Sequence, residues 1–105
     1  MRAEAQAHVD RINEALALLR RFLDWDRALR RLDELNARVE DPTLWDDPKA
    51  AQVVMRERPR LDEAIAATRA IESELEDTVA LMEMAEAEGD AAMVDEGVAS
   101  LAALA

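Results

Sequence analysis

The sequence has no cysteine and no tyrosine, one histidine, two glycines and three prolines. Without cysteine there can be neither a disulfide framework nor a thiolate zinc site. The two glycines lie far apart, so they form no glycine-rich loop that could cradle phosphate. The single histidine, His8, has no glutamate three positions before it, as a di-iron helix would require. We therefore interpret His8 as a surface residue or one that flanks a helix seam.

Long apolar runs are also missing, since no stretch approaches the ~18 residues that a membrane-spanning helix needs. The first ten residues carry charges but no apolar core of a secretion signal. We therefore expect a cytoplasmic protein that contacts no membrane. No calcium loop of alternating acids around a central glycine is present. The sequence predicts no catalytic residue, no cofactor and no metal site, which disfavours a small helical metalloenzyme.

Basic residues are absent from the last third of the chain. After Arg69 there is no lysine or arginine, while ten acids follow, and the net charge of the whole chain is −11. Such a surface repels polyanionic phosphate, so we expect no direct binding of nucleic acid by this chain. Basic residues cluster earlier, in RALRR (27–31) and RERPR (56–60). The acidic part is either a solvated helix face or a surface for a basic partner.

What the chain does contain is typical of helices: it has 22 alanines, and its apolar residues recur in steps of three and four. We predict an all-α protein with helical runs over residues 5–23, 24–41, 48–87 and 91–105. The first run has a heptad seam at five positions: Val9, Ile12, Leu16, Leu19 and Leu23. The second run has its apolar face at Trp25, Leu29, Leu32, Leu35 and Val39. The third has its seam at Leu61, Ile65, Thr68, Ile71, Leu75, Val79 and Met82, with Val53 and Val54 earlier.

The predicted architecture is an elongated antiparallel helical bundle of three main helices plus a shorter C-terminal helix. The third run alone would span ~60 Å at the α-helical rise of ~1.5 Å per residue. We expect residues 1–105 to form a single helical domain. The last run places Val94, Val98 and Leu101 on one face and then stops within its pattern, at LAALA. This favours a chain that is part of a longer protein.

Helix boundaries are indicated by a few residues. Asp24 is expected to cap the second helix, although one bent helix through this junction is the alternative. Pro42 should end the second helix, and Asp47 before Pro48 should start the third. Pro59 lies inside the third helix, where we expect a kink or a break. The pair Gly89–Asp90 predicts a turn.

The reversal EDPTLWDDP (40–48) contains one of the two tryptophans. We interpret Leu44 and Trp45 as an apolar plug that closes one end of the bundle, with an exposed indole for partner contact as the alternative. Acids on the helices have arginines three or four positions away, as in Glu57–Arg60 and Asp26–Arg30, which predicts intrahelical ion pairs. Met82, Met84 and Met93 are expected to fill the core, or else to form a soft protein-binding patch.

Several motifs, in order, resemble the N-terminal region of the bacterial peptide chain release factor 2 family. They are LDWD (23–26), LDELNARVEDPTLWDDP (32–48), the AQ and RER of the third helix, and ELEDTVALMEMAEAEGD (74–90). The resemblance extends from about Ile12 to the end of the chain. The Trp-Asp-Asp-Pro turn is closer to release factor 2 than to its paralogue, release factor 1. Pro59 departs from the pattern and puts only the straightness of the third helix in doubt.

The resemblance implies a factor that directs translation termination at UGA and UAA stop codons. Codon reading in this family rests on a Ser-Pro-Phe tripeptide and peptidyl-tRNA hydrolysis on a Gly-Gly-Gln loop, and neither occurs in these 105 residues. The chain therefore looks like the accessory N-terminal domain alone, without the codon-reading and Gly-Gly-Gln domains. Its implied partners are ribosomal stalk-base proteins and the release factor 3 GTPase.

A second hypothesis is a free-standing acidic helical adaptor that binds a partner helix along its seam. An exposed seam would also favour dimerisation of the chain. The two hypotheses differ in the codons that they expect after Ala105 in the gene. A continuation into a sequence with Gly-Gly-Gln would exclude the adaptor, and a stop codon there would favour it.

Overall fold

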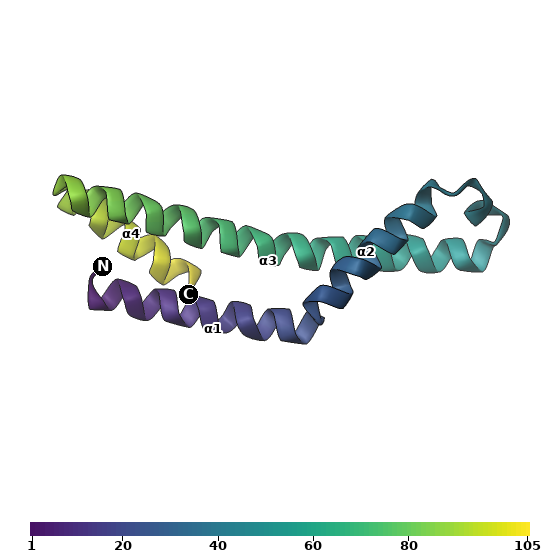
Figure 1. Cartoon of the computed structure of the whole chain (residues 1–105), viewed down its shortest axis with the longest axis horizontal. Helices are drawn as coiled ribbons and strands as arrows, with labels where there is room; N and C mark the ends of the chain where they lie inside the picture. Colours follow the sequence, from purple (N-terminus) through teal and green to yellow (C-terminus); the bar gives the residue numbers. More distant parts are fainter. The chain divides into compact units, whose positions relative to one another are not determined.

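The computed structural model describes residues 1–105 and contains four α-helices, one short 3₁₀ helix and no strand (Figure 1). The elements are α1 Ala3–Leu23, α2 Trp25–Glu40, η1 Pro42–Asp46, α3 Pro48–Glu88 and α4 Ala91–Leu104. The all-α prediction is confirmed. Since α2 has 16 residues and α4 has 14, the predicted division into three main helices and one minor helix is less sharp than expected. None of the helices combines the length and the apolar content that a bilayer crossing requires.

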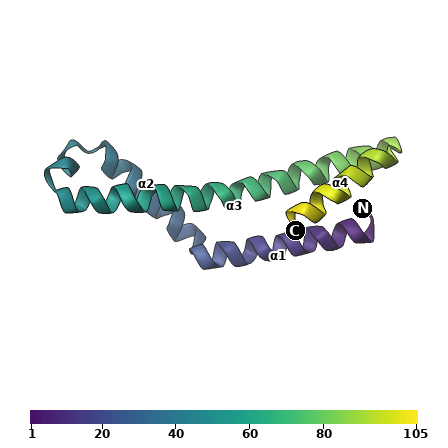
Figure 2. The same cartoon turned by 180° about the vertical axis from the view of Figure 1, so that it is seen from behind.

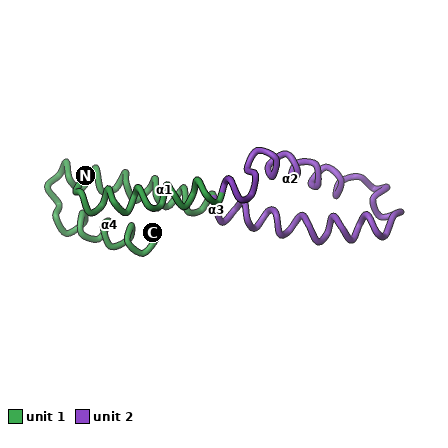
Figure 3. The backbone as a smooth tube through the Cα atoms, turned by 90° about the horizontal axis from the view of Figure 1, so that it is seen from below, with its two compact units in different colours: residues 1–19, 69–105 green, residues 20–68 purple.

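The helices form two compact units, shown in two colours in Figure 3. Unit 1 consists of Met1–Leu19 and Arg69–Ala105, and unit 2 consists of Arg20–Thr68. Helix α3 contributes its second half to unit 1 and its first half to unit 2. Each unit has its own apolar cluster.

Unit 1 is built from α1, the second half of α3 and α4, and α4 turns back along the end of α3 (Figures 1 and 2). Its buried cluster draws on all three helices: Ala5, Ile12, Leu16, Leu75, Met82, Ala85, Val94 and Leu101. The predicted seams supply most of these residues. Leu19 is an exception, because its side chain is exposed.

Unit 2 is a helical hairpin in which α2 lies beside the first half of α3 (Figures 1 and 2). Its buried cluster is small, with Leu35 from α2, Leu44 from η1, and Ala51 and Val54 from α3. Partly buried apolar side chains flank it: Val39, Ala50 and Leu61. The chain reversal between the helices brings these residues together, as the antiparallel prediction requires.

The junction of α1 and α2 is one residue, Asp24, with φ 52° and ψ 69°. Aspartate tolerates this left-handed conformation better than most residues do, which explains how a helix break occurs without glycine. Two separate helices are therefore present rather than one bent helix. The predicted side-chain cap is wrong, because the Asp24 carboxylate accepts no capping hydrogen bond. The backbone forms the junction instead, since the Asp24 carbonyl accepts from Ala28 N at 2.8 Å.

The chain reversal from α2 to α3 is held by two aspartates. Asp41 Oδ1 accepts hydrogen bonds from Thr43 N at 2.9 Å and from Thr43 Oγ1 at 2.8 Å. These hydrogen bonds, the backbone one first, lower the pKa of the Asp41 carboxyl below its usual value. Asp47 Oδ1 accepts from Ala50 N at 3.2 Å in the first turn of α3. The predicted stop near Pro42 and the predicted start at Asp47–Pro48 are confirmed.

The prediction that Leu44 and Trp45 form a buried apolar plug is correct for only one of the two residues. Leu44 is 6% exposed and belongs to the unit 2 cluster, whereas Trp45 is 55% exposed, so its predicted burial is wrong. The reason is local geometry: η1 is a 3₁₀ helix with three residues per turn, in which neighbouring side chains point in different directions. Leu44 takes the inward position, and the indole of Trp45 reaches solvent.

We expect Leu44→Ala to destabilise the chain by about 2–3 kcal/mol, because it removes a core leucine. Trp45→Ala should cost less than about 1 kcal/mol, because a side chain already half in water loses little burial. Urea unfolding followed by far-ultraviolet circular dichroism measures both without relying on indole fluorescence. Equal losses for the two variants would contradict the assignment of inward and outward positions.

Helix α3 continues without a break through Pro59 (Figure 1). Of the predicted kink or break, the break is therefore wrong. Proline removes the hydrogen bond to the carbonyl four residues earlier, that of Met55. Pro59 and Met55 are both exposed, so water can satisfy the freed carbonyl on this side of the helix.

The predicted turn at Gly89–Asp90 is confirmed. Gly89 has φ 71°, the left-handed conformation that ends many helices, and Asp90 Oδ1 accepts from Met93 N at 3.1 Å to cap α4. The prediction for the methionines holds only in part. Met82 is buried in the unit 1 cluster, whereas Met84 and Met93 are exposed.

Candidate functional site

The residues with catalytic or metal-binding chemistry are dispersed. No group of three histidine, cysteine, aspartate or glutamate side chains is placed to hold a metal ion. His8 lies half-buried on α1 next to Val9, a partly buried neighbour of the unit 1 cluster, so it flanks the seam. Its Nδ1 is buried and has no hydrogen-bond partner. The features that can act in recognition are charges and cavities.

The charge is divided unequally between the units. Unit 1 has 13 acidic and 3 basic residues, a net charge of −10, and unit 2 has 11 acidic and 10 basic residues, a net charge of −1. Almost all of the net charge of −11 therefore belongs to unit 1. A polyanion is repelled by unit 1, and a basic partner is attracted to it.

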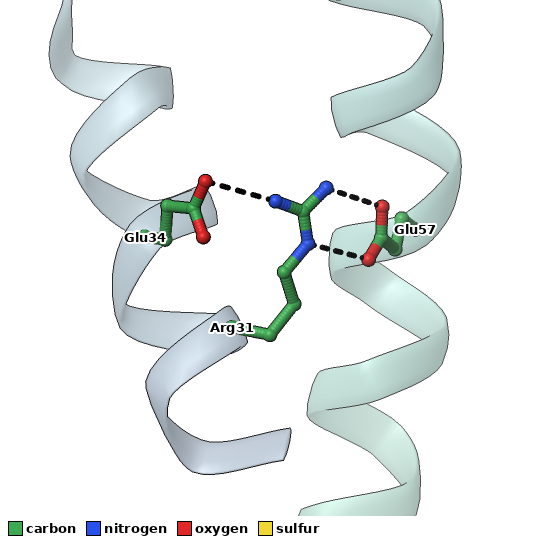
Figure 4. A network of polar contacts seen from close by, with 3 residues as sticks. All are labelled: Arg31, Glu34 and Glu57. Carbon is green, nitrogen blue, oxygen red and sulfur yellow. Dashed lines mark hydrogen bonds and ion pairs between the residues drawn. The ribbon is translucent and has the colours of Figure 1, made fainter. Parts of the chain in front are cut away.

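Within unit 2, Arg31 of α2 joins the two helices (Figure 4). Its Nε donates to Glu57 Oε1 at 2.7 Å and its Nη2 donates to Glu57 Oε2 at 2.8 Å. The third guanidinium nitrogen, Nη1, lies 3.0 Å from Glu34 Oε1 on α2. Two parallel hydrogen bonds between a guanidinium and a carboxylate fix their relative orientation as well as their distance. Nearby, Arg58 Nε donates to Asn36 Oδ1 at 2.6 Å.

This network differs from the predicted pairing of Glu57 with Arg60. Glu57 lies between Val54 and Leu61 on the face of α3 that packs against α2, so its carboxylate points toward α2 rather than along α3. The signal was present in the sequence as an acid at a seam position. The identity of its partner was not, because Arg31 lies 26 positions earlier.

Hydrogen bonds from Arg31 are the main reason why the pKa of the Glu57 carboxyl is below its usual value. A depressed carboxyl pKa stabilises the fold above the pKa of the unfolded chain, and this stabilisation is lost as the pH falls through the folded value. In the same contact, the hydrogen bond to Glu57 is the main cause of a raised pKa for Arg31, which has no consequence at ordinary pH because arginine stays charged.

We expect Glu57→Gln to lower the free energy of unfolding by about 0.5–1 kcal/mol at neutral pH, a small value because both side chains are partly in water. The difference from wild type should shrink as the pH falls below the usual range of a glutamate carboxyl and through the lowered pKa of Glu57 in the folded chain. Urea titrations between pH 3 and 7 measure it. Glu63→Gln, which removes an acid without an ion partner on the same helix, is the control. A deficit that stays constant over this range would contradict the ion pair.

A cavity of about 690 Å³ adjoins this network in unit 2. It is lined by Leu23, Asp24, Arg27, Ala28, Arg30, Arg31, Glu34, Glu57 and Leu61. Three arginines and three acids contribute to it, so their charges balance. The cavity therefore selects neither an anion nor a cation.

A second cavity, of about 670 Å³, lies in unit 1 where α3 turns into α4. Two ion pairs border it. The ammonium group of Met1 lies 3.5 Å from Glu86 Oε2, and Arg2 pairs with Asp95 of α4. These contacts hold the start of the chain against both α3 and α4.

Comparison with known proteins supports the sequence motifs. The model of the PCRF domain matches residues 28–105. Peptide chain release factor 2 of Paramagnetospirillum magneticum is 51% identical over 104 residues, which cover 99% of this chain and 28% of that protein. The protein of the same name from Roseobacter denitrificans is 48% identical over the same shares. The one from Phenylobacterium zucineum is 55% identical over 78 residues, 74% of this chain and 21% of that protein.

The chain thus spans little more than a quarter of the length of these relatives. Their names describe whole proteins, of which this chain matches one part. The PCRF match, however, covers well over half of the chain. The chain belongs to the PCRF domain family.

Proposed function

We propose that residues 1–105 form the N-terminal accessory domain of a peptide chain release factor 2, which directs translation termination at UGA and UAA codons. The observation that supports this most strongly is the identity of about half over nearly the whole chain to relatives that bear this name. The acidic, helical surface supports a role in binding rather than in catalysis.

In this proposal the domain itself is not an enzyme. The tripeptides associated with codon reading and hydrolysis, Ser-Pro-Phe and Gly-Gly-Gln, do not occur in its sequence. The acid–arginine contacts that do occur are structural: Arg31 pairs with Glu57 between helices and with Glu34 within α2, and Arg2 ties the start of the chain to Asp95 of α4. The purified chain should therefore release no peptide from ribosomes halted at a stop codon. Stop-codon-dependent release by this chain alone would overturn the non-catalytic assignment.

The acidic unit 1 is the proposed protein-contacting part. Its net charge of −10 disfavours ribosomal RNA and favours basic protein surfaces. We propose that it contacts proteins at the base of the ribosomal stalk and the release factor 3 GTPase, in the cytoplasm.

Crosslinking tests this placement directly. The chain has no cysteine, so Glu74→Cys or Glu83→Cys supplies one attachment point for a photocrosslinker on unit 1. Glu40→Cys at the end of α2 in unit 2 is the matched control. We expect ribosome-dependent crosslinks to stalk-base proteins from residues 74 and 83 and not from residue 40. Crosslinks that do not depend on ribosomes, or that are equal from all three positions, would contradict the proposal.

A further inference from the structure

A row of basic residues lies on the first half of α3, within unit 2. Lys49, Val53, Arg56 and Arg60, here called the basic stripe, are separated by four, three and four positions. This spacing places them above one another on one face of an α-helix. All four side chains are exposed, so the predicted place of Val53 in the seam is wrong, whereas Val54 is buried as predicted. The stripe is therefore a continuous surface with three cations around one apolar residue.

The stripe lies off the face of α3 that meets α2. The side of α3 that packs on α2 carries Ala51, Val54 and Leu61 of the unit 2 cluster and the paired Glu57. The three cations of the stripe are offset from the centre of that side by about a third of a helical turn. Nothing else in unit 2 covers them, since the hairpin consists of two helices and the short η1.

The three cations of the stripe have no acid partner, although acids outnumber basic residues in this chain by 24 to 13. Two neighbouring arginines already have partners within unit 2: Arg31 pairs with Glu57, and Arg58 donates a hydrogen bond to Asn36. No ion pair or side-chain hydrogen bond involves Lys49, Arg56 or Arg60. Glu63, one turn beyond Arg60, marks the end of the stripe. Its cations are thus free to meet an external anion.

We propose that the basic stripe binds the phosphodiester backbone of RNA. This rests on the proposed function, which brings the domain to a particle rich in RNA. Arg56 and Arg60 lie about 6 Å apart along the helix axis, and the whole stripe is about 16 Å long. One strand of B-form DNA carries a phosphate every ~3.4 Å of axis, and the more compact A-form of an RNA duplex brings them closer, so the stripe is long enough to meet several consecutive phosphates. Lysine and arginine contacts of this kind position a protein on nucleic acid without reading its sequence.

Two observations favour RNA over an acidic protein as the partner. The stripe has one apolar residue, Val53, whereas the centre of a protein interface is rich in apolar and aromatic side chains. The second observation is the charge asymmetry. Unit 1 carries −10 and unit 2 only −1, so the field of the domain repels RNA from unit 1. The stripe lies on unit 2, where this repulsion is weakest. The expectation that the chain has no grip on nucleic acid is thereby restricted to unit 1.

The test uses the 105-residue chain and a fluorescein-labelled, 16-base-pair RNA duplex, with binding followed by anisotropy at several salt concentrations. The variant replaces the three cations together (Lys49→Gln, Arg56→Gln and Arg60→Gln). A matched control makes the same change in net charge with other exposed arginines (Arg11→Gln, Arg21→Gln and Arg27→Gln). Glutamine is a good helix former, so both variants should keep the wild-type circular dichroism spectrum.

We expect the stripe variant to bind at least about tenfold more weakly than the control, and its slope of log affinity against log salt to fall by about 2–3, since each lost phosphate contact removes ~0.7–0.9. Equal losses in both variants would show a bulk charge effect and overturn the proposal, as would a wild-type chain that does not bind the duplex. Stripe-dependent binding of polyglutamate without RNA binding, or stripe-dependent self-association, would assign the surface to a protein partner or a second copy instead. Because no ribosome is used, failure here is distinct from failure of the crosslinking experiment.

Discussion

Replacing Gly97 by alanine should destabilise the wild-type chain and stabilise a chain in which Met82 is already alanine. Gly97 lies within α4, where glycine is about 1 kcal/mol less favourable than alanine. Helix propensity alone thus predicts a gain from Gly97→Ala. The structure predicts a loss, because the new Cβ would overlap Met82 Cγ and Sδ.

Met82 cannot move aside easily. It is 1% exposed and lies among the buried residues of unit 1, and the overlapping atoms are in the middle of its side chain rather than at its tip. Overpacking of this kind costs typically about 1–3 kcal/mol. We therefore expect Gly97→Ala to lower the free energy of unfolding by up to about 2 kcal/mol after the gain in propensity is subtracted.

Met82→Ala on its own should cost about 2–5 kcal/mol, because it leaves a cavity in the core. In that background the Cβ of residue 97 enters the vacated space, and Gly97→Ala should add up to about 1 kcal/mol of stability. The change of sign is a coupling between two residues in contact. Urea unfolding of the four chains of the cycle, followed by circular dichroism, measures it.

Gly89→Ala is the control for this cycle. Gly89 has φ 71°, and no atom lies within 4 Å of where its Cβ would be. Its substitution should cost about 1–2 kcal/mol through backbone strain alone, with the same cost whether residue 82 is methionine or alanine. A Gly97→Ala chain more stable than wild type would show that α4 does not pack on Met82 as described.

The helices could be predicted because their information is local. Apolar steps of three and four residues mark the seams, and Asp47–Pro48 and Gly89–Asp90 mark ends that the structure confirms. These signals need only residues within a turn or two of each other. The continuity of α3 through Pro59 could not be predicted in this way, because it depends on the position of Pro59 on the exposed side of the helix.

The directions of the Trp45 and Glu57 side chains could not be predicted from residues nearby in the sequence. Hydrophobicity predicted burial of both Leu44 and Trp45, but the 3₁₀ geometry of η1 allows only Leu44 to reach the cluster. For Glu57, an intrahelical arginine and a distant one were equally available in the sequence. Packing of α2 against α3 decides for Arg31.

The sequence indicated the acidic and the basic surface only as a trend in charge along the chain. The absence of basic residues after Arg69 predicts an acidic region, and RERPR (56–60) predicts a basic one. The structure separates the arginines of that motif by their directions. Arg58 turns to Asn36 on α2, while Arg56 and Arg60 face outward. The sequence alone does not reveal this difference, because it depends on which side of α3 packs against α2.

Leu35→Ala should open unit 2. Leu35 is fully buried and is the only fully buried leucine of the small cluster formed with Leu44, Ala51 and Val54. Removing it should cost about 3 kcal/mol or more, because few neighbours are available to collapse into the cavity. At ~0.05–0.15 kcal/mol per residue, a unit of this size contributes about 2.5–7 kcal/mol in all. One substitution is therefore comparable with the entire stability of the hairpin.

Native-state hydrogen exchange measures this locally. We expect amides of α2 and η1 to lose most of their protection in Leu35→Ala, because α2 has no other buried cluster to hold it against α3. Leu32→Ala is the matched control, the same change on the same helix at a half-buried position, and it should cost about 1 kcal/mol. If both variants lost protection equally, burial in this cluster would not be what holds the hairpin together. Other features of α2, such as buried Ala28 and the Arg31–Glu57 pair, would then have to be the main support, although a water-exposed ion pair is expected to contribute little.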